Sequence, residues 1–248
     1  MDGVISEARL LTEVSETVIN IQGFQKTTLL DFPGHVAATV FLGGCNMRCP
    51  FCHNMDIVTT DKPPLFNDEE ILGFLNKRRG ILDGVCITGG EPTLYPELPS
   101  FIKLIRGLGF MIKLDTNGTN PVMLGSLIKD GLVDYVAMDI KSSLSGYAKA
   151  CGIKDIRLAP IKESIDLLLK GNVEYEFRTT AVEELLDDTV IKEIGQLIDG
   201  ADRYFLQGYV ESEFVPDRSL TAVPKEKLLH YRQELIKHIK QVELRGID

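Results

Sequence analysis

Short apolar runs and longer amphipathic stretches alternate along most of this chain. The apolar runs are rich in β-branched residues and span residues 37–42, 84–88, 111–115, 135–140, 174–180 and 204–207. Stretches with helical periodicity lie between them, at residues 68–79, 98–107, 122–129, 161–170 and 189–198. Strands that alternate with helices are typical of parallel sheets built from βαβ units. About six such repeats predict an α/β fold, a partial (β/α)6 barrel with parallel strands rather than a closed eight-stranded one.

The two ends of the chain depart from this pattern. Residues 17–33 predict a hairpin before the first barrel strand, and residues 1–19 predict an N-terminal extension. Residues 224–240 place apolar side chains on one helical face and a proline near the first turn, which predicts an amphipathic helix. No linker-like composition separates two halves, so we expect residues 20–248 to form one domain.

Charge and hydropathy argue against two classes of partner. The 248 residues carry a formal net charge of −9, whereas a nucleic-acid binder needs cationic surface to displace counterions. The apolar runs are too short to span a bilayer, and the first residues do not form an apolar leader. We therefore expect a cytoplasmic protein with no nucleic-acid or membrane partner.

Three of the five cysteines cluster directly after the first predicted barrel strand. They are Cys45, Cys49 and Cys52, and this loop follows the carboxyl end of the strand, where α/β barrels carry their active sites. An odd number of cysteines with three grouped together is a poor disulfide framework. In a reducing compartment such a group indicates metal binding or catalysis.

The residues themselves leave four interpretations of this group open. Three thiolates could hold an iron–sulfur cluster and leave one iron for a non-protein ligand, since such clusters usually take four cysteines. His53 could complete a closed Cys₃His zinc site, although its adjacency to Cys52 makes that geometry awkward. The C-x-x-C-H pattern from Cys49 also fits haem attachment, which requires export. Buried inert thiols are the last alternative, and the spacing favours the open cluster.

Several segments resemble one enzyme superfamily. The C-x3-C-x2-C spacing with Phe51 before the last cysteine resembles the cluster motif of the radical S-adenosylmethionine (SAM) superfamily, and the segment from Thr88 to Pro92 resembles its GGEP motif. Residues 23–34 resemble the start of glycyl radical enzyme activating enzymes, nearest the anaerobic ribonucleoside-triphosphate reductase activating protein family. Two further segments resemble motifs of the related pyruvate formate-lyase activating enzyme, at residues 114–118 and 138–141.

The resemblance implies a reaction and its partners. The three clustered cysteines would bind a [4Fe–4S] cluster that cleaves SAM reductively, and the resulting radical would abstract hydrogen from a glycine of a partner enzyme. The implied partner is anaerobic ribonucleotide reductase, with flavodoxin or ferredoxin as electron donor. Cys86 is the only cysteine between Cys52 and Gly89. This indicates the type of activating enzyme that carries a single cluster. The alternatives are a radical SAM enzyme for a small molecule or another peptide, and a zinc or electron-carrier module without activity.

The resemblance also assigns site residues. The implied SAM contacts are Phe51, Cys52, His53, Gly89, Gly90, Glu91, Asp139, Lys141, Arg178 and Gln207. A monovalent cation, Na⁺ or K⁺, would be held by Asp115, Thr116 and Asp139. Strand-end capping is the alternative role for these three, and bracing the loop is the alternative role for Glu91. Arg178 lies in an apolar strand and so requires an anionic partner, while Cys86 reads as a buried small side chain and Cys151 has no predicted role.

Overall fold

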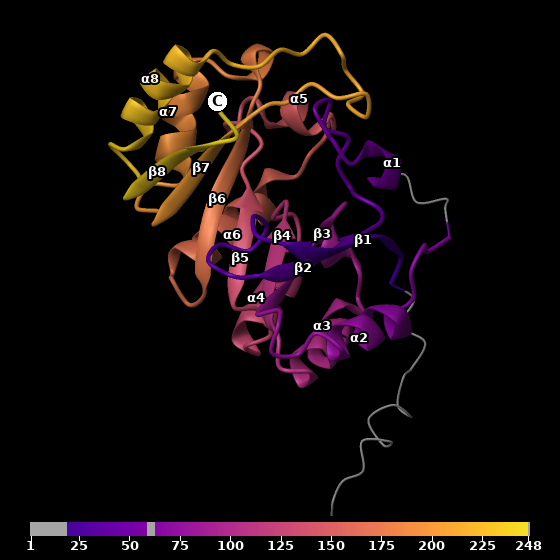
Figure 1. The fold of residues 1–248 in the computed structure, drawn as a ribbon. Helices are drawn as coiled ribbons and strands as arrows, with labels where there is room; N and C mark the ends of the chain where they lie inside the picture. Colours follow the sequence, from indigo (N-terminus) through magenta and orange to yellow (C-terminus); the bar gives the residue numbers. More distant parts are fainter. Residues whose placement is uncertain (1–18, 59–62, 248) are drawn as a thin grey trace, which may run out of the picture.

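The computed structural model of the chain describes residues 19–58 and 63–247. Within these ranges, eight strands form a single sheet in the order in which they occur along the chain (Figure 1). The strands are β1 (Ile21–Thr28), β2 (Ala37–Leu42), β3 (Gly84–Gly89), β4 (Met111–Thr116), β5 (Tyr135–Asp139), β6 (Glu174–Ala181), β7 (Arg203–Gly208) and β8 (Gln241–Arg245). Strands β2 to β8 are parallel and β1 is antiparallel to β2. The strand order has two ends, so the sheet is an open barrel.

Helices connect the parallel strands and cover the outer side of the sheet (Figure 1). They are α1 (Met55–Val58), α2 (Asp68–Asn76), α3 (Leu98–Gly107), α4 (Pro121–Lys129), α5 (Tyr147–Cys151), α6 (Leu158–Leu169), α7 (Asp188–Leu197) and α8 (Lys225–Leu235). Asn67 begins α2 with a capping box, in which its side chain accepts from the Glu70 amide and Glu70 accepts from the Asn67 amide. No helix in the described ranges is long and apolar enough to cross a membrane.

The six predicted barrel strands are confirmed as β2 to β7, but the prediction for the amino-terminal segment is corrected. Strand β1 makes its hairpin with β2 itself, because its partner residues run from Leu42 back to Ala37. Strand β8 extends the sheet beyond β7 and was not predicted. The extension predicted for residues 1–19 lies outside the described residues, except for its last residue.

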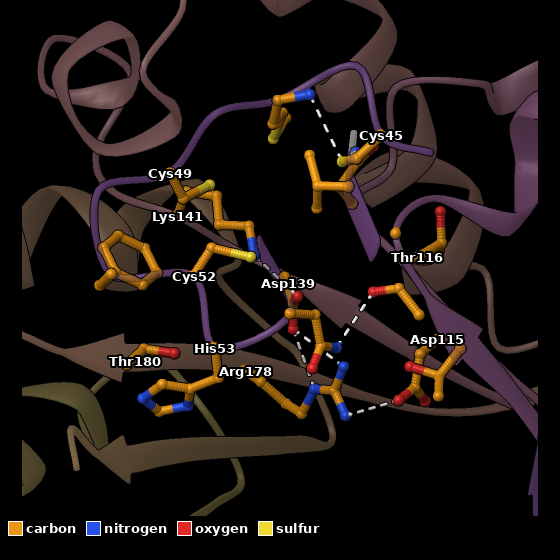
Figure 2. Close-up of a pocket in the computed structure, with 18 of the residues that line it drawn as sticks. Cys45, Cys49, Cys52, His53, Asp115, Thr116, Asp139, Lys141, Arg178 and Thr180 are labelled. Atoms are coloured by element: carbon orange, nitrogen blue, oxygen red, sulfur yellow. Dashed lines mark hydrogen bonds and ion pairs between the residues drawn. The ribbon is translucent and has the colours of Figure 1, made fainter. Parts of the chain in front are cut away.

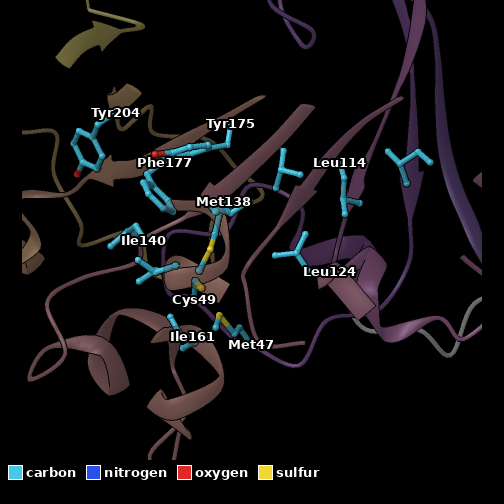
Figure 3. Packing of buried hydrophobic residues seen from close by; sticks show 14 of the residues in the cluster. Met47, Cys49, Leu114, Leu124, Met138, Ile140, Ile161, Tyr175, Phe177 and Tyr204 are labelled. Carbon is cyan, nitrogen blue, oxygen red and sulfur yellow. The ribbon is translucent and has the colours of Figure 1, made fainter. Parts of the chain in front are cut away.

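The two faces of the sheet differ in chemistry because side chains alternate along each strand. On the outer face, Val136 and Met138 join a hydrophobic core with Leu124 of α4 and Ile161 of α6 (Figure 3). The inner face instead buries polar groups, such as Lys113 of β4, which is 2% exposed. The concave interior of the open barrel is therefore suited to charged ligands.

An aromatic side chain closes the amino-terminal end of this interior. Phe32, in the loop between β1 and β2, packs against Ala37 and Tyr135 and is 2% exposed. A Cβ atom on Gly84 would lie 2.8 Å from the Phe32 ring. The interior consequently opens at the opposite end, where the strands reach their carboxyl termini.

Candidate active site

The loop that follows β2 brings the three clustered cysteines to the wall of one cavity. Cys45, Cys49 and Cys52 all line this cavity at the carboxyl end of the sheet (Figure 2). All three are free thiols, and Cys49 is the most buried of them, with 7% of its surface exposed. Three cysteines close in sequence therefore face one space, as an open cluster requires.

Contacts on both sides fix the shape of this loop. Met47 is 2% exposed and belongs to the same hydrophobic core as Ile161 (Figure 3). Burying a side chain of this size stabilises a fold by about 1.5–3 kcal/mol. The Arg48 amide donates to the Cys151 carbonyl at 2.8 Å. Cys151 thus holds the loop through its backbone, and its thiol does not line the cavity.

Burial raises the pKa of the three thiols, and one lysine opposes that effect. The pKa of Cys49 rises to about 12 because the thiol is desolvated, and the charge of Lys141 acts in the opposite direction. Burial likewise raises the pKa of Cys45 and of Cys52, and Lys141 again acts to lower both. These thiols need a cation or a metal to ionise.

The two glycines after β3 let a second loop approach the cysteine loop closely. A Cβ atom on Gly90 would lie 1.8 Å from the Gly44 carbonyl oxygen, and one on Gly89 would lie 2.3 Å from that of Leu42. Gly89 also has a φ of +118°, which disfavours other residues. The Gly90 amide donates to the Leu42 carbonyl at 2.8 Å. Both glycines line the cavity, and their contact with SAM stays a prediction.

Glu91 does not line the cavity, and its contact with SAM stays a prediction. The residue is fully buried, and one carboxylate oxygen accepts from the Thr116 hydroxyl at 2.8 Å. The other accepts from the Asn117 amide at 2.6 Å. Glu91 therefore braces the loops after β3 and β4. The sequence left this role open but could not identify Thr116 and Asn117 as the partners, because they lie at the end of another strand and just after it.

A row of alternating charges crosses the inner face of β4, β5 and β6 (Figure 2). Arg178 lies 3.2 Å from the Asp115 carboxylate and 3.0 Å from that of Asp139. Lys141 contacts the second oxygen of Asp139 at 2.8 Å, and Lys113 contacts Asp115. Arg178 thus has two anionic partners, and each of these two carboxylates has two cations.

These contacts keep the carboxylates ionised. Burial alone would raise the pKa of Asp139, but the charges of Arg178 and Lys141 lower it to about 2. Burial would likewise raise the pKa of Asp115, and Arg178 and Lys113 lower it instead. Burial opposes the charge of Lys141, yet Asp139 and the Cys49 thiol raise its pKa. All five members of the row, which we call the charge ladder, are ionised at neutral pH.

The three residues predicted to hold a monovalent cation all line the cavity, but they have other partners. The two carboxylates share Arg178, and the Thr116 hydroxyl donates to Glu91. A cation would have to replace the guanidinium between Asp115 and Asp139. The cation remains a prediction, and these residues fit it less well than the cysteines fit a cluster.

Phe51, His53 and Gln207 also line the cavity. Phe51 is 5% exposed. His53 shares a 2.7 Å hydrogen bond between its Nε2 and the Val210 carbonyl, so its imidazole is engaged away from the three sulfurs (Figure 2). A closed Cys₃His zinc site would need that nitrogen or a rotated ring. The described residues therefore favour an open three-cysteine site.

Some polar residues of the cavity were not among the predicted site residues. Asn117 donates to the Asn46 side chain at 2.8 Å and approaches the Cys45 sulfur at 3.9 Å. Thr180 lines the cavity from the end of β6. Both follow the rule that polar residues at the carboxyl ends of parallel strands face the site, and that signal could have found them.

Three thiols, a nearby lysine and a charged inner wall fit a [4Fe–4S] cluster and a zwitterionic ligand such as SAM. Residues 39–201, well over half of the chain, match the family described as the Radical SAM superfamily. The chain belongs to the radical SAM superfamily. Membership implies a [4Fe–4S] cluster and SAM, and it makes the protein an enzyme. The matched residues include the cysteine loop and the glycines after β3.

Relatives agree with this assignment, and a solved structure has a similar fold. The chain is 32% identical over 240 residues, 92% of its length and 96% of the relative's, to a candidate glycyl-radical enzyme activating enzyme of Methanocaldococcus jannaschii. It is 32% identical over 126 residues, 49% of its length and 52% of the relative's, to the pyruvate formate-lyase-activating enzyme of Clostridium pasteurianum. A domain of the pyruvate-formate lyase-activating enzyme from Bacteroides vulgatus has a similar fold, with a TM-score of 0.54 and 20% identity over 66% of this chain and 99% of that domain.

Proposed function

We propose that this radical SAM enzyme activates a glycyl radical enzyme by abstracting hydrogen from one of its backbone glycines. The observation that carries the proposal is the 32% identity to a candidate activating enzyme across 92% of the chain. The open carboxyl end of the barrel supports it, because a loop from a partner protein needs an accessible cavity. The partner we propose is anaerobic ribonucleoside-triphosphate reductase.

In this proposal the cavity residues divide between two cofactors. Cys45, Cys49 and Cys52 would hold the [4Fe–4S] cluster, which when bound supplies one electron to the sulfonium of SAM. Residues that would contact SAM line the rest of the cavity: Phe51, His53, Gly89, Gly90, Asp139, Lys141, Arg178 and Gln207. The chain's part is to bind both cofactors side by side and to limit access of water.

The electron that starts the reaction would come from another protein. The remaining cysteines, Cys86 and Cys151, lie outside the cavity lining, so the chain offers no second cluster to relay electrons. We therefore propose flavodoxin or ferredoxin as the donor.

The test is a radical assay with the reconstituted enzyme, SAM, a reductant and the reductase from the same organism. We expect a glycine-centred electron paramagnetic resonance signal on the reductase, and none when Cys49 is replaced by alanine. The proposal fails if each glycyl radical enzyme of the organism stays free of radical while the enzyme still consumes SAM. In that case the substrate is a small molecule or another peptide.

A further inference from the structure

Lys141 is the cation that the three cysteines share. Its ammonium lies 5.9 Å from the centre of the ring of Phe51, which stands between Cys49 and Cys52 in the loop. Figure 2 shows the ammonium beside these two thiols, and its charge acts on all three cysteines. Among the described residues that line the cavity, the other permanent cation is Arg178, which is occupied by two carboxylates.

The charge ladder fixes the position of Lys141. Its ammonium is held by Asp139 at 2.8 Å, and the opposite oxygen of Asp139 is held by Arg178 at 3.0 Å. The Lys141 side chain is 17% exposed, so little water screens its charge. A lysine free to swing into solvent would have a weak and variable influence, whereas this one presents a constant charge to the cysteine loop.

We propose that Lys141 makes the cluster easier to reduce, in addition to any contact it makes with SAM. This inference rests on the proposed cluster site. Reduction adds one electron from the donor protein and changes no bond to the chain. A fixed positive charge nearby stabilises the reduced, more negative state, and local charge is one of the features that set cluster potentials. The carboxylate of Asp139, which also acts on Cys52, opposes this effect.

The test is a redox titration of the cluster without SAM, followed by electron paramagnetic resonance. Lys141→Met removes the charge and keeps most of the length of the side chain. We expect its equilibrium constant for reduction to fall at least about tenfold, a midpoint potential lower by about 59 mV for a one-electron couple. Lys141→Arg should keep the wild-type potential. So should Lys149→Met, because Lys149 binds the Glu184 carbonyl outside the cavity.

A second variant, with the opposite expected change in midpoint potential, keeps the inference testable if Lys141→Met loses the cluster. Asp139→Asn removes the negative charge but keeps an oxygen for Lys141, so its potential should rise. A wild-type potential in Lys141→Met with full iron content would overturn the inference. If that variant binds no iron, an Asp139→Asn potential equal to or below wild type would overturn it instead.

These outcomes are separable from those of the proposed function. The titration needs neither SAM nor a partner enzyme, so the expected shifts can occur even if no glycyl radical forms. Conversely, a wild-type chain that binds no iron after anaerobic reconstitution would refute the proposed site itself.

Discussion

Replacing Arg178 by methionine should destabilise the protein by about 3 kcal/mol at pH 7. Removing one partner from a buried ion pair costs about 3–5 kcal/mol because it leaves a buried charge uncompensated. The side chains of Arg178, Asp115 and Asp139 are 13%, 15% and 28% exposed. Each carboxylate keeps a lysine after the substitution, so we expect the lower end of that range.

The pKa of Asp139 gives an independent magnitude. Its fall from 3.8 to about 2 corresponds to a stabilisation on the order of 2 kcal/mol. Arg178 and Lys141 provide this stabilisation together. Because the pKa is lower in the folded state, the stabilisation is complete above pH 3.8 and is lost as the pH falls towards 2. The difference between wild type and Arg178→Met should therefore be large at pH 7 and shrink below pH 3.8.

Urea unfolding of the iron-free protein, followed by circular dichroism, measures both the loss of stability at pH 7 and its decrease in acid. The matched control is Arg203→Met, which breaks an ion pair with Glu174 whose side chains are 38% and 69% exposed. Exposed pairs contribute about 0–1 kcal/mol. The reasoning is refuted if Arg178→Met costs no more than Arg203→Met, or if its cost does not decrease in acid.

Other substitutions test separate parts of the site. Anaerobically reconstituted protein should bind about four irons, as a [4Fe–4S] site does. Iron analysis should show that alanine in place of any cluster cysteine abolishes iron binding, whereas Cys151→Ala does not. Loss of iron in Cys151→Ala would mean that Cys151 is a fourth protein ligand. Gly90→Ala places a Cβ atom 1.8 Å from the Gly44 carbonyl, so the iron content should fall sharply, and full loading would contradict the close packing of the two loops. Phe32→Ala should lower the free energy of unfolding by about 3–5 kcal/mol, measured by urea titration, and a loss below about 1 kcal/mol would mean that Phe32 does not close the barrel.

The sequence pattern predicted those parts of the fold that depend on local periodicity. The six strands β2 to β7 are β-branched runs between helical stretches, and all six form as expected. Strand β8 was missed because Gln241, Glu243 and Arg245 give it a polar inner face, which resembles a surface loop. Residues 17–33 were predicted to form a hairpin before the first barrel strand, but β1 pairs with β2, and periodicity does not encode which strand is the partner.

The candidate site was predictable where residues close together in the sequence form a recognisable motif. The cysteine group and the glycines identify the cavity, and the need of Arg178 for an anion is met by Asp115 and Asp139. The distant partners of Glu91 were not predictable, because Thr116 ends β4 and Asn117 follows it, far from Glu91 in sequence. Lys113 was not predicted either. Its ion pair with Asp115 becomes evident only in the structure.

The most direct test of the proposed activation is the fate of a single hydrogen atom. The partner enzyme is produced with deuterated glycine and incubated anaerobically with this enzyme, SAM and a reductant. Mass spectrometry of the 5′-deoxyadenosine formed then reports the source of its hydrogen. We predict that deuterium enters 5′-deoxyadenosine in step with the appearance of the radical on the partner. Radical formation accompanied only by unlabelled 5′-deoxyadenosine would contradict direct abstraction from glycine.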